Sequence, residues 1–338
     1  MLRHYNSLIF FIFIASTSCK EQKQSHANEQ EFEPISISFQ NERAEYEPIK
    51  PIHFIDSDPN KVALGKLLFH DNSITKNGKS SCASCHNLKK GGADYTAISK
   101  GVDTTDGVLN TPSVYNAVFN FRQFWDGQAS DLTEAVHDTV SLTKNAGISW
   151  TKAIWVINHD GQYTEMFQHL YNGDISKKTI TDAIVGYEKT LVTPSRFDRF
   201  LLGDEEAISK QERKGYQLFK EYGCGSCHQG VNIGGNMYQK LGIVRDYFKD
   251  HDTIKKVDWG RFNITQKQSD KFSFKVPSLR NVSLTAPYLH NGEVQTLKQA
   301  IQVMAVYQIG RNIPDNEIND IEAFLQSLTG EELEKHNQ

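Results

Sequence analysis

Two copies of one cysteine–histidine motif are the strongest chemical signal in this sequence. Cys82-Ala-Ser-Cys85-His86 and Cys224-Gly-Ser-Cys227-His228 share the spacing C-x-x-C-H. This spacing is typical of covalent haem attachment, in which the two thiols bond to the porphyrin and the histidine binds its iron. Four cysteines in two C-x-x-C pairs also suit a zinc site. With 12 histidines in 338 residues, chance places a histidine at a given position only about once in 28. A histidine directly after both C-x-x-C pairs therefore favours haem over zinc.

A haem iron held by one histidine has a sixth coordination position, whose occupant decides what the iron can do. Met304 lies in a stretch of helical pattern after the second motif and is a candidate sixth ligand of the second haem. The position that matches it in the first half is Thr139, which is a poor iron ligand. The sequence therefore predicts a His/Met electron carrier at the second haem and an open face at the first. A methionine of the hydrophobic core is the alternative interpretation of Met304.

The segments that must position these motifs occur twice. Each half contains a helical lead-in with inward Leu and Phe, a Pro-Ser block, and a closing helical block with a buried aromatic residue. The pairs are Gly65–Phe69 with Gly215–Phe219, Pro112–Asn116 with Pro277–Asn281 at an offset of 165, and Ile184–Leu191 with Ile321–Leu328. Strand patterns are scarce. We therefore predict a mainly α fold made of two cytochrome c-type domains related by internal duplication, an N-terminal domain over residues 50–200 and a C-terminal domain over 201–330.

The N-terminus has the pattern of an export signal. Leu8–Ala15 is an apolar run too short to span a bilayer, and small residues lead from it to Cys19. This resembles a bacterial lipobox, in which Cys19 is lipidated; an ordinary signal peptide with a coincidental cysteine is the alternative. We expect a signal peptide over 1–19 and a flexible tether over 20–49. The protein is then expected in the periplasm or cell envelope, attached to the membrane through the lipid anchor only.

The overall composition supports an ordinary globular protein. Hydrophobic residues make up 38% and charged residues 23%, with a net charge of −4 and a pI near 6.3. Nucleic-acid-binding domains usually carry a basic excess, which is missing here. We therefore expect no nucleic-acid partner.

From residue 55 to residue 330 the sequence resembles the bacterial di-haem cytochrome c peroxidases, a family that also includes the MauG-type enzymes. Besides the two C-x-x-C-H motifs, the resemblance rests on four blocks: Asn110–Val114, Gln123–Gly127, Val276–Asn281 and Thr285–Gly292. It implies two c-type haems and a calcium ion near the interface of two cytochrome c domains. It also implies that the second haem takes electrons from a small cytochrome c or cupredoxin and passes them to the first, where hydrogen peroxide is reduced. A homodimer is a further expectation.

The resemblance also assigns residues. His86 and His228 match the proximal iron ligands, and Met304 matches the distal ligand of the second haem, which is a tyrosine in MauG-type enzymes. Trp125 matches the tryptophan between the haems and is a candidate catalytic residue. The calcium ligands fall on the side chain of Asn110 and the carbonyls of Thr285 and Pro287.

The sequence departs from the family around the first haem. The stretch Ile98–Gly101 lacks the histidine that blocks this haem in many members, and Lys100 lies there instead. The distal glutamine and glutamate that serve peroxide cleavage fall on Ala135 and Asn145. His137 is the nearest candidate catalytic substitute, although a surface histidine is the alternative. A non-peroxidatic electron-transfer protein or oxidase-like enzyme is therefore the rival to a peroxidase.

Overall fold

The computed structural model describes residues 45–75, 78–99, 109–141, 149–251 and 253–337. The predicted signal peptide, Cys19, most of the predicted tether, Lys100 and Asn145 lie outside these ranges. Within them, no helix is both long and apolar enough to cross a membrane.

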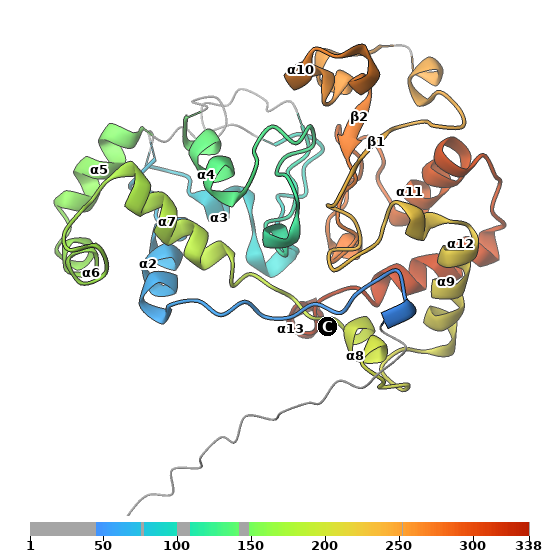
Figure 1. Ribbon diagram of the computed structural model, residues 1–338, viewed down its shortest axis with the longest axis horizontal. Coiled ribbons are helices and arrows are strands. Elements are labelled where there is room, and N and C mark those ends of the chain that lie inside the picture. Colours follow the sequence, from blue (N-terminus) through green and yellow to red (C-terminus); the bar gives the residue numbers. More distant parts are fainter. Residues whose placement is uncertain (1–44, 76–77, 100–108, 142–148, 252, 338) are drawn as a thin grey trace, which may run out of the picture. The chain divides into compact units, whose positions relative to one another are not determined.

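The described chain is mainly helical, as predicted (Figure 1). Up to residue 188 its elements are α2 (Pro59–His70), α3 (Cys82–Cys85), the 3-10 turns η1 (Leu88–Lys90) and η2 (Ala117–Phe119), α4 (Leu132–Ser141), α5 (Trp150–Asn158), α6 (Gly161–Tyr171) and α7 (Lys177–Glu188). They are followed by α8 (Arg196–Leu201), α9 (Lys210–Glu221), η3 (Cys224–Ser226), β1 (Tyr238–Lys240), η4 (Tyr247–Asp250), η5 (Lys256–Trp259), α10 (Phe262–Thr265), η6 (Gln268–Asp270), β2 (Ser273–Lys275), η7 (Val282–Leu284), α11 (Leu297–Met304), the π-helix η8 (Ala305–Ile309), α12 (Asp315–Gln326) and α13 (Glu331–Asn337). Strands β1 and β2 pair antiparallel, with Tyr238 opposite Lys275.

Buried apolar side chains form two main clusters that follow the two halves of the sequence. The first cluster uses residues between Leu64 and Leu191. The second uses residues between Phe197 and Leu328, together with Ile49. All described residues nevertheless belong to one compact unit.

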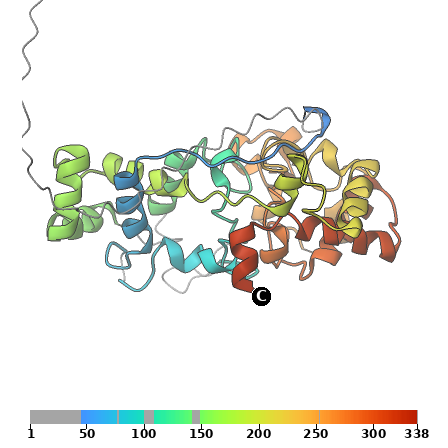
Figure 2. The same cartoon turned by 90° about the horizontal axis from the view of Figure 1, so that it is seen from below.

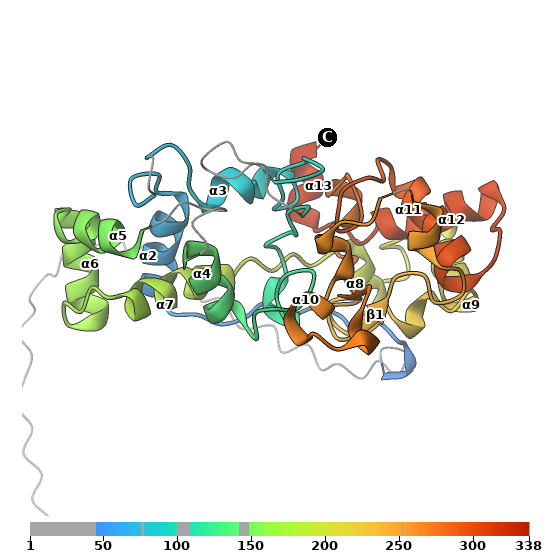
Figure 3. The same ribbon diagram turned by 90° about the horizontal axis from the view of Figure 1, so that it is seen from above.

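Each cluster contains a pair of helices in close contact at a glycine. Helices α2 and α7 meet at Gly65, and α9 and α12 meet at Gly215; in each pair the two helices lie side by side (Figures 1 and 3). A Cβ atom at Gly65 would lie 2.0 Å from the Ala183 carbonyl oxygen, and one at Gly215 would lie 1.8 Å from that of Asp320. The two glycines therefore allow the same close helix crossing in both halves.

We expect Gly215→Ala to lower the free energy of unfolding by about 1–3 kcal/mol, the usual cost of overpacking. The added methyl group overlaps a backbone oxygen, which outweighs the better helix propensity of alanine. Gly161→Ala is the matched control, because Gly161 begins α6 and a Cβ there meets nothing within 4 Å. Urea denaturation measures both variants, and equal midpoints would contradict the close crossing.

Between the two helices of each pair, the chain also makes matching turns at the offset of 165. Asn116 and Asn281 both have φ of 59°, both precede a 3-10 turn, and both donate a side-chain hydrogen bond of 2.8 Å to Thr193 Oγ1. Isolated antiparallel bridges pair Gln123 with Ala129 and Tyr288 with Val294. The two halves thus share these local turn geometries.

Residues 45–52, here called the N-terminal strap, pack against the second half (Figures 1 and 2). Ile49 is fully buried in the second cluster and bridges to Gly230. The Ile52 amide donates a 2.9 Å hydrogen bond to Asp198, and the Glu47 carboxylate accepts hydrogen bonds from the side chains of Tyr216 and Lys220. The end of the predicted tether is thus held by specific contacts.

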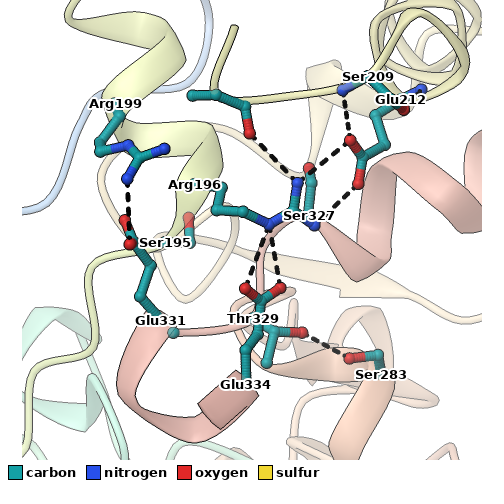
Figure 4. A network of polar contacts seen from close by, with 12 residues as sticks. Ser195, Arg196, Arg199, Ser209, Glu212, Ser283, Ser327, Thr329, Glu331 and Glu334 are labelled. Atoms are coloured by element: carbon teal, nitrogen blue, oxygen red, sulfur yellow. Dashed lines mark hydrogen bonds and ion pairs between the residues drawn. The ribbon is translucent and has the colours of Figure 1, made fainter. Parts of the chain in front are cut away.

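A polar network centred on Arg196 fixes the connection between the two clusters (Figure 4). The Arg196 guanidinium donates to Glu212 in α9 at 2.9 Å and to Glu334 in α13 at 3.2 Å. Hydrogen bonding to Glu212 raises the pKa of Arg196 above its ordinary value. The start of α8 is therefore tied to both elements by charge-assisted hydrogen bonds.

Candidate haem sites

The first C-x-x-C-H motif folds as one helical turn that aims its histidine inward. The His86 amide donates to the Cys82 carbonyl at 2.9 Å, which closes the turn of α3. The His86 Nδ1–H donates to the Gly92 carbonyl at 3.1 Å. Burial lowers the pKa of His86, so the ring is neutral. Its Nε2 lone pair is then available to a metal.

The second motif repeats this geometry. The His228 amide donates to the Cys224 carbonyl at 3.0 Å, and its Nδ1–H donates to the Ile233 carbonyl at 3.3 Å. Burial lowers the pKa of His228 to about 4. Both histidines therefore donate Nδ1–H to a backbone carbonyl and leave the Nε2 lone pair available to a metal ion.

The cysteines do not form the alternative zinc site. Among the described residues, no group of three or more Cys, His, Asp or Glu side chains lies close enough to hold a metal ion. Burial raises the pKa of Cys82 to about 12 and that of Cys224 to about 11. Such surroundings disfavour the thiolates that zinc binds and suit uncharged thioethers to haem.

A cavity of ≈ 320 Å³ adjoins the second motif. Cys224, Cys227, His228 and Met304 all line it. The rest of its wall is largely apolar, with side chains that include Phe219, Leu241, Leu279, Val282, Leu289, Ile301, Ile313 and Leu325. An apolar wall with a few polar groups is typical of cofactor sites. The structure thus brings Met304 into the same cavity as His228, as its predicted role requires.

Trp125 also lines this cavity. Its indole N–H donates to the Asn110 carbonyl at 2.8 Å, and its own carbonyl accepts from the Lys275 amide at 2.8 Å. The ring is therefore held between the Asn110 block and strand β2.

The three predicted calcium ligands lie on the wall of the same cavity. One of them, Asn110, comes from the first half of the chain, and Thr285 and Pro287 come from the second. The backbone N–H of Asn110 links the two segments by donating to the His290 carbonyl at 2.8 Å. No described residue donates a hydrogen bond to Asn110 Oδ1 or to the carbonyls of Thr285 and Pro287. Free amide and carbonyl oxygens are the ligands that calcium prefers, so this set is compatible with the ion.

His137 lies on α4, the helix that also carries Ala135. Its side chain is 39% exposed, its Nδ1 lies 3.7 Å from an Asp138 carboxylate oxygen, and its ring is 6.1 Å from that of Trp150. The structure therefore gives His137 partial access to solvent and a nearby carboxylate.

Sequence reasoning missed two features of the cavity wall. His290 Nε2 and Asp258 Oδ1 form a buried pair at 2.7 Å, and Lys275 is only 6% exposed. His290 belongs to the Thr285–Gly292 block, so its position in the sequence was a usable signal. A lysine is mostly exposed in proteins, and nothing in the local sequence marks Lys275 as buried.

Comparisons with known proteins identify the family of this chain. The family model described as di-haem cytochrome c peroxidase matches residues 59–206. The chain is 44% identical to cytochrome c peroxidase Ccp of Escherichia coli (strain K12) over 84% of its length, and spans 61% of that protein. It is 41% identical to cytochrome c551 peroxidase of Nitrosomonas europaea (strain ATCC 19718), covering 85% of each chain.

Among solved structures, a MauG-like protein associated with microbial copper homeostasis has a similar fold. The TM-score is 0.75 at 24% identity, over 85% of this chain and 95% of the other. The two curated relatives and the family model agree on one assignment. The chain belongs to the di-haem cytochrome c peroxidase family.

Proposed function

We propose that this chain is a di-haem cytochrome c peroxidase that reduces hydrogen peroxide with electrons from a small cytochrome c or cupredoxin. The reaction is H₂O₂ + 2 e⁻ + 2 H⁺ → 2 H₂O. The observation that carries the proposal is the pair of half-buried, neutral histidines, each directly after C-x-x-C, of which the second shares its cavity with Met304.

The residues fit two covalent haems. Cys82 and Cys85 would hold the first and Cys224 and Cys227 the second, with His86 and His228 as proximal ligands and Met304 as the distal ligand of the second haem. When bound, the haems would supply the redox chemistry, the second for oxidation of the donor and the first for reduction of peroxide. The matched glycine crossings and Asn turns support two duplicated cytochrome c domains, over 50–200 and 201–330, as the scaffold.

Other residues organise the path between the two centres. Trp125 is fixed by its hydrogen bond to Asn110, and we assign it to electron transfer. Calcium bound by Asn110, Thr285 and Pro287 would join segments from both halves. On α4, which also carries Glu134 and Asp138, we assign proton transfer to His137.

The cellular setting follows from the motifs. Covalent haem attachment fits export to the periplasm, and Cys19 would anchor the chain to the membrane through lipid after cleavage of residues 1–19. Assembly as a homodimer is also part of the proposal.

Steady-state peroxide-dependent oxidation of a reduced small cytochrome c tests the proposal on the holoprotein. Wild type should contain two covalent haems and exceed the rate of free haem peptide. Cys82→Ala with His86→Ala should lose turnover yet still accept electrons from the donor, because the second site is intact. Cys224→Ala with His228→Ala should lose donor oxidation. Wild-type turnover no faster than haem peptide would contradict a peroxidase.

The second candidate function is electron transfer without peroxide turnover. Ala135 favours it, because its methyl side chain can neither donate nor accept the proton that O–O cleavage requires. Under this alternative, both haems are reduced by the donor but peroxide does not reoxidise them.

A further inference from the structure

Lys275 is a buried cation on the wall of the second haem cavity. It ends strand β2, all three residues of which are buried, and only 6% of its surface is exposed. Its backbone amide donates to the Trp125 carbonyl at 2.8 Å, which fixes the strand beside that ring. The residue lines the cavity together with His228 and Met304.

The Lys275 ammonium has no partner in the described part of the chain. Its Nζ atom makes no hydrogen bond or ion pair with any described residue. Burial lowers the pKa of Lys275 to about 8. A buried charge is unfavourable unless it is paired, so an anion in the cavity would stabilise it.

The cavity wall cannot supply that anion. Among the described residues that line the cavity there is no aspartate or glutamate. Two other basic side chains of the cavity wall already have acidic partners. Arg280 binds Asp198 at 2.8 Å, and His290 binds Asp258 at 2.7 Å. The His228 ring points its Nδ1–H at a backbone carbonyl. Lys275 is thus the unpaired cation among the described residues of this wall. Its counter-ion must therefore belong to the molecule that fills the cavity.

We propose that Lys275 binds a propionate carboxylate of the second haem and thereby raises the reduction potential of that haem. The inference rests on the proposed placement of the haem in this cavity. A positive charge near the iron opposes oxidation to the more positive ferric state. Pairing also satisfies the buried ammonium, which accounts for an unpaired lysine in a largely apolar wall. The same residue then couples the haem to Trp125 through the backbone of β2.

Spectroelectrochemical titration of the holoprotein tests this binding. In Lys275→Met, the ratio of reduced to oxidised second haem at a fixed potential should fall about tenfold, a negative shift of about 59 mV for a one-electron couple. Lys275→Arg keeps the charge and should stay near wild type. Lys240→Met is the matched control, because Lys240 lies on the paired strand β1 but is exposed. The first haem should keep its potential in all variants.

Resonance Raman spectra report directly on the haem propionates. A purely structural role of Lys275 would leave their bending band unchanged. The propionate bending band of the second haem should shift in Lys275→Met and not in Lys240→Met. If Lys275→Met does not fold, Lys275→Gln carries the same test. An unchanged potential and band in the uncharged variant would overturn the propionate contact. Peroxide turnover does not enter this test, so a chain with two haems but no peroxidase activity can still confirm it.

Discussion

Ala135→Gln combined with Asn145→Glu is expected to raise peroxide turnover by about 10²–10⁴-fold, the usual contribution of positioned acid–base groups. Cleavage of the O–O bond needs a group that moves a proton between the two oxygens, and neither native side chain titrates in the useful range. Ala135 lies on α4, so a glutamine there projects from a defined helix. The measurement is the steady-state rate with saturating reduced cytochrome c.

The control for this gain is Ala135→Gln combined with Asn145→Gln, which matches the size of the pair but lacks the carboxyl group. It should remain within a few-fold of wild type. His137→Ala examines the native proton source: a large loss of turnover would identify His137 as the substitute. A native enzyme that is already fast, and that responds to none of these changes, would show that the family's distal positions were matched to the wrong residues.

Arg280→Met is expected to lower the free energy of unfolding by about 3–5 kcal/mol, the cost of breaking a buried ion pair by removing one partner. The Arg280 and Asp198 side chains are 0% and 3% exposed, and two N–H groups of Arg280 donate to the carboxylate at 2.8 Å. Without Arg280, Asp198 is left as a buried charge with only the hydrogen bonds from Ser195 and Ile52. Urea unfolding of the holoprotein measures the loss.

Two further variants separate this effect from general damage. Arg280→Met with Asp198→Leu removes both charges and should recover much of the loss. Arg213→Met breaks the exposed pair with Glu205 and should cost no more than about 1 kcal/mol. A loss of that small size in Arg280→Met would show that the buried pair is not stabilising.

The same pair predicts an acid limit to stability. Burial opposes ionisation of Asp198, but the Arg280 charge and hydrogen bonds hold its pKa below the ordinary value. A carboxyl with a lowered pKa stabilises the fold fully above its unfolded pKa, near 3.9, and loses that contribution as the pH falls through its native pKa. Wild type should therefore destabilise below about pH 4 more steeply than the variant that lacks both charges.

The sequence predicted the helical class and several residues that line the cavity beside the second C-x-x-C-H motif, among them His228 and Met304, because these leave local signals. A C-x-x-C-H motif requires only a single turn, and the turn directs His86 and His228 inward by itself. The offset of 165 likewise anticipated that Asn116 and Asn281 occupy matching turns. The ligand roles of Met304 and of the calcium residues stay predictions.

The remaining features depend on partners far apart in the chain. Asp198 and Arg280 are 82 residues apart, and neither neighbourhood indicates a buried charge. Ile49 stands at the end of a polar segment, so its burial in the second cluster had no local signal. Lys275 is buried because strand β2 is covered on both sides, which a three-residue strand cannot reveal.

The N-terminal strap has a consequence for the order in which the chain assembles. Ile52 is hydrogen-bonded to a residue 146 positions later, and the Lys50 carbonyl to one 230 positions later. The strap is the first described segment of the chain, yet it can dock only after the elements that carry its distant partners have come together. Until then the second core stays open where Ile49 belongs.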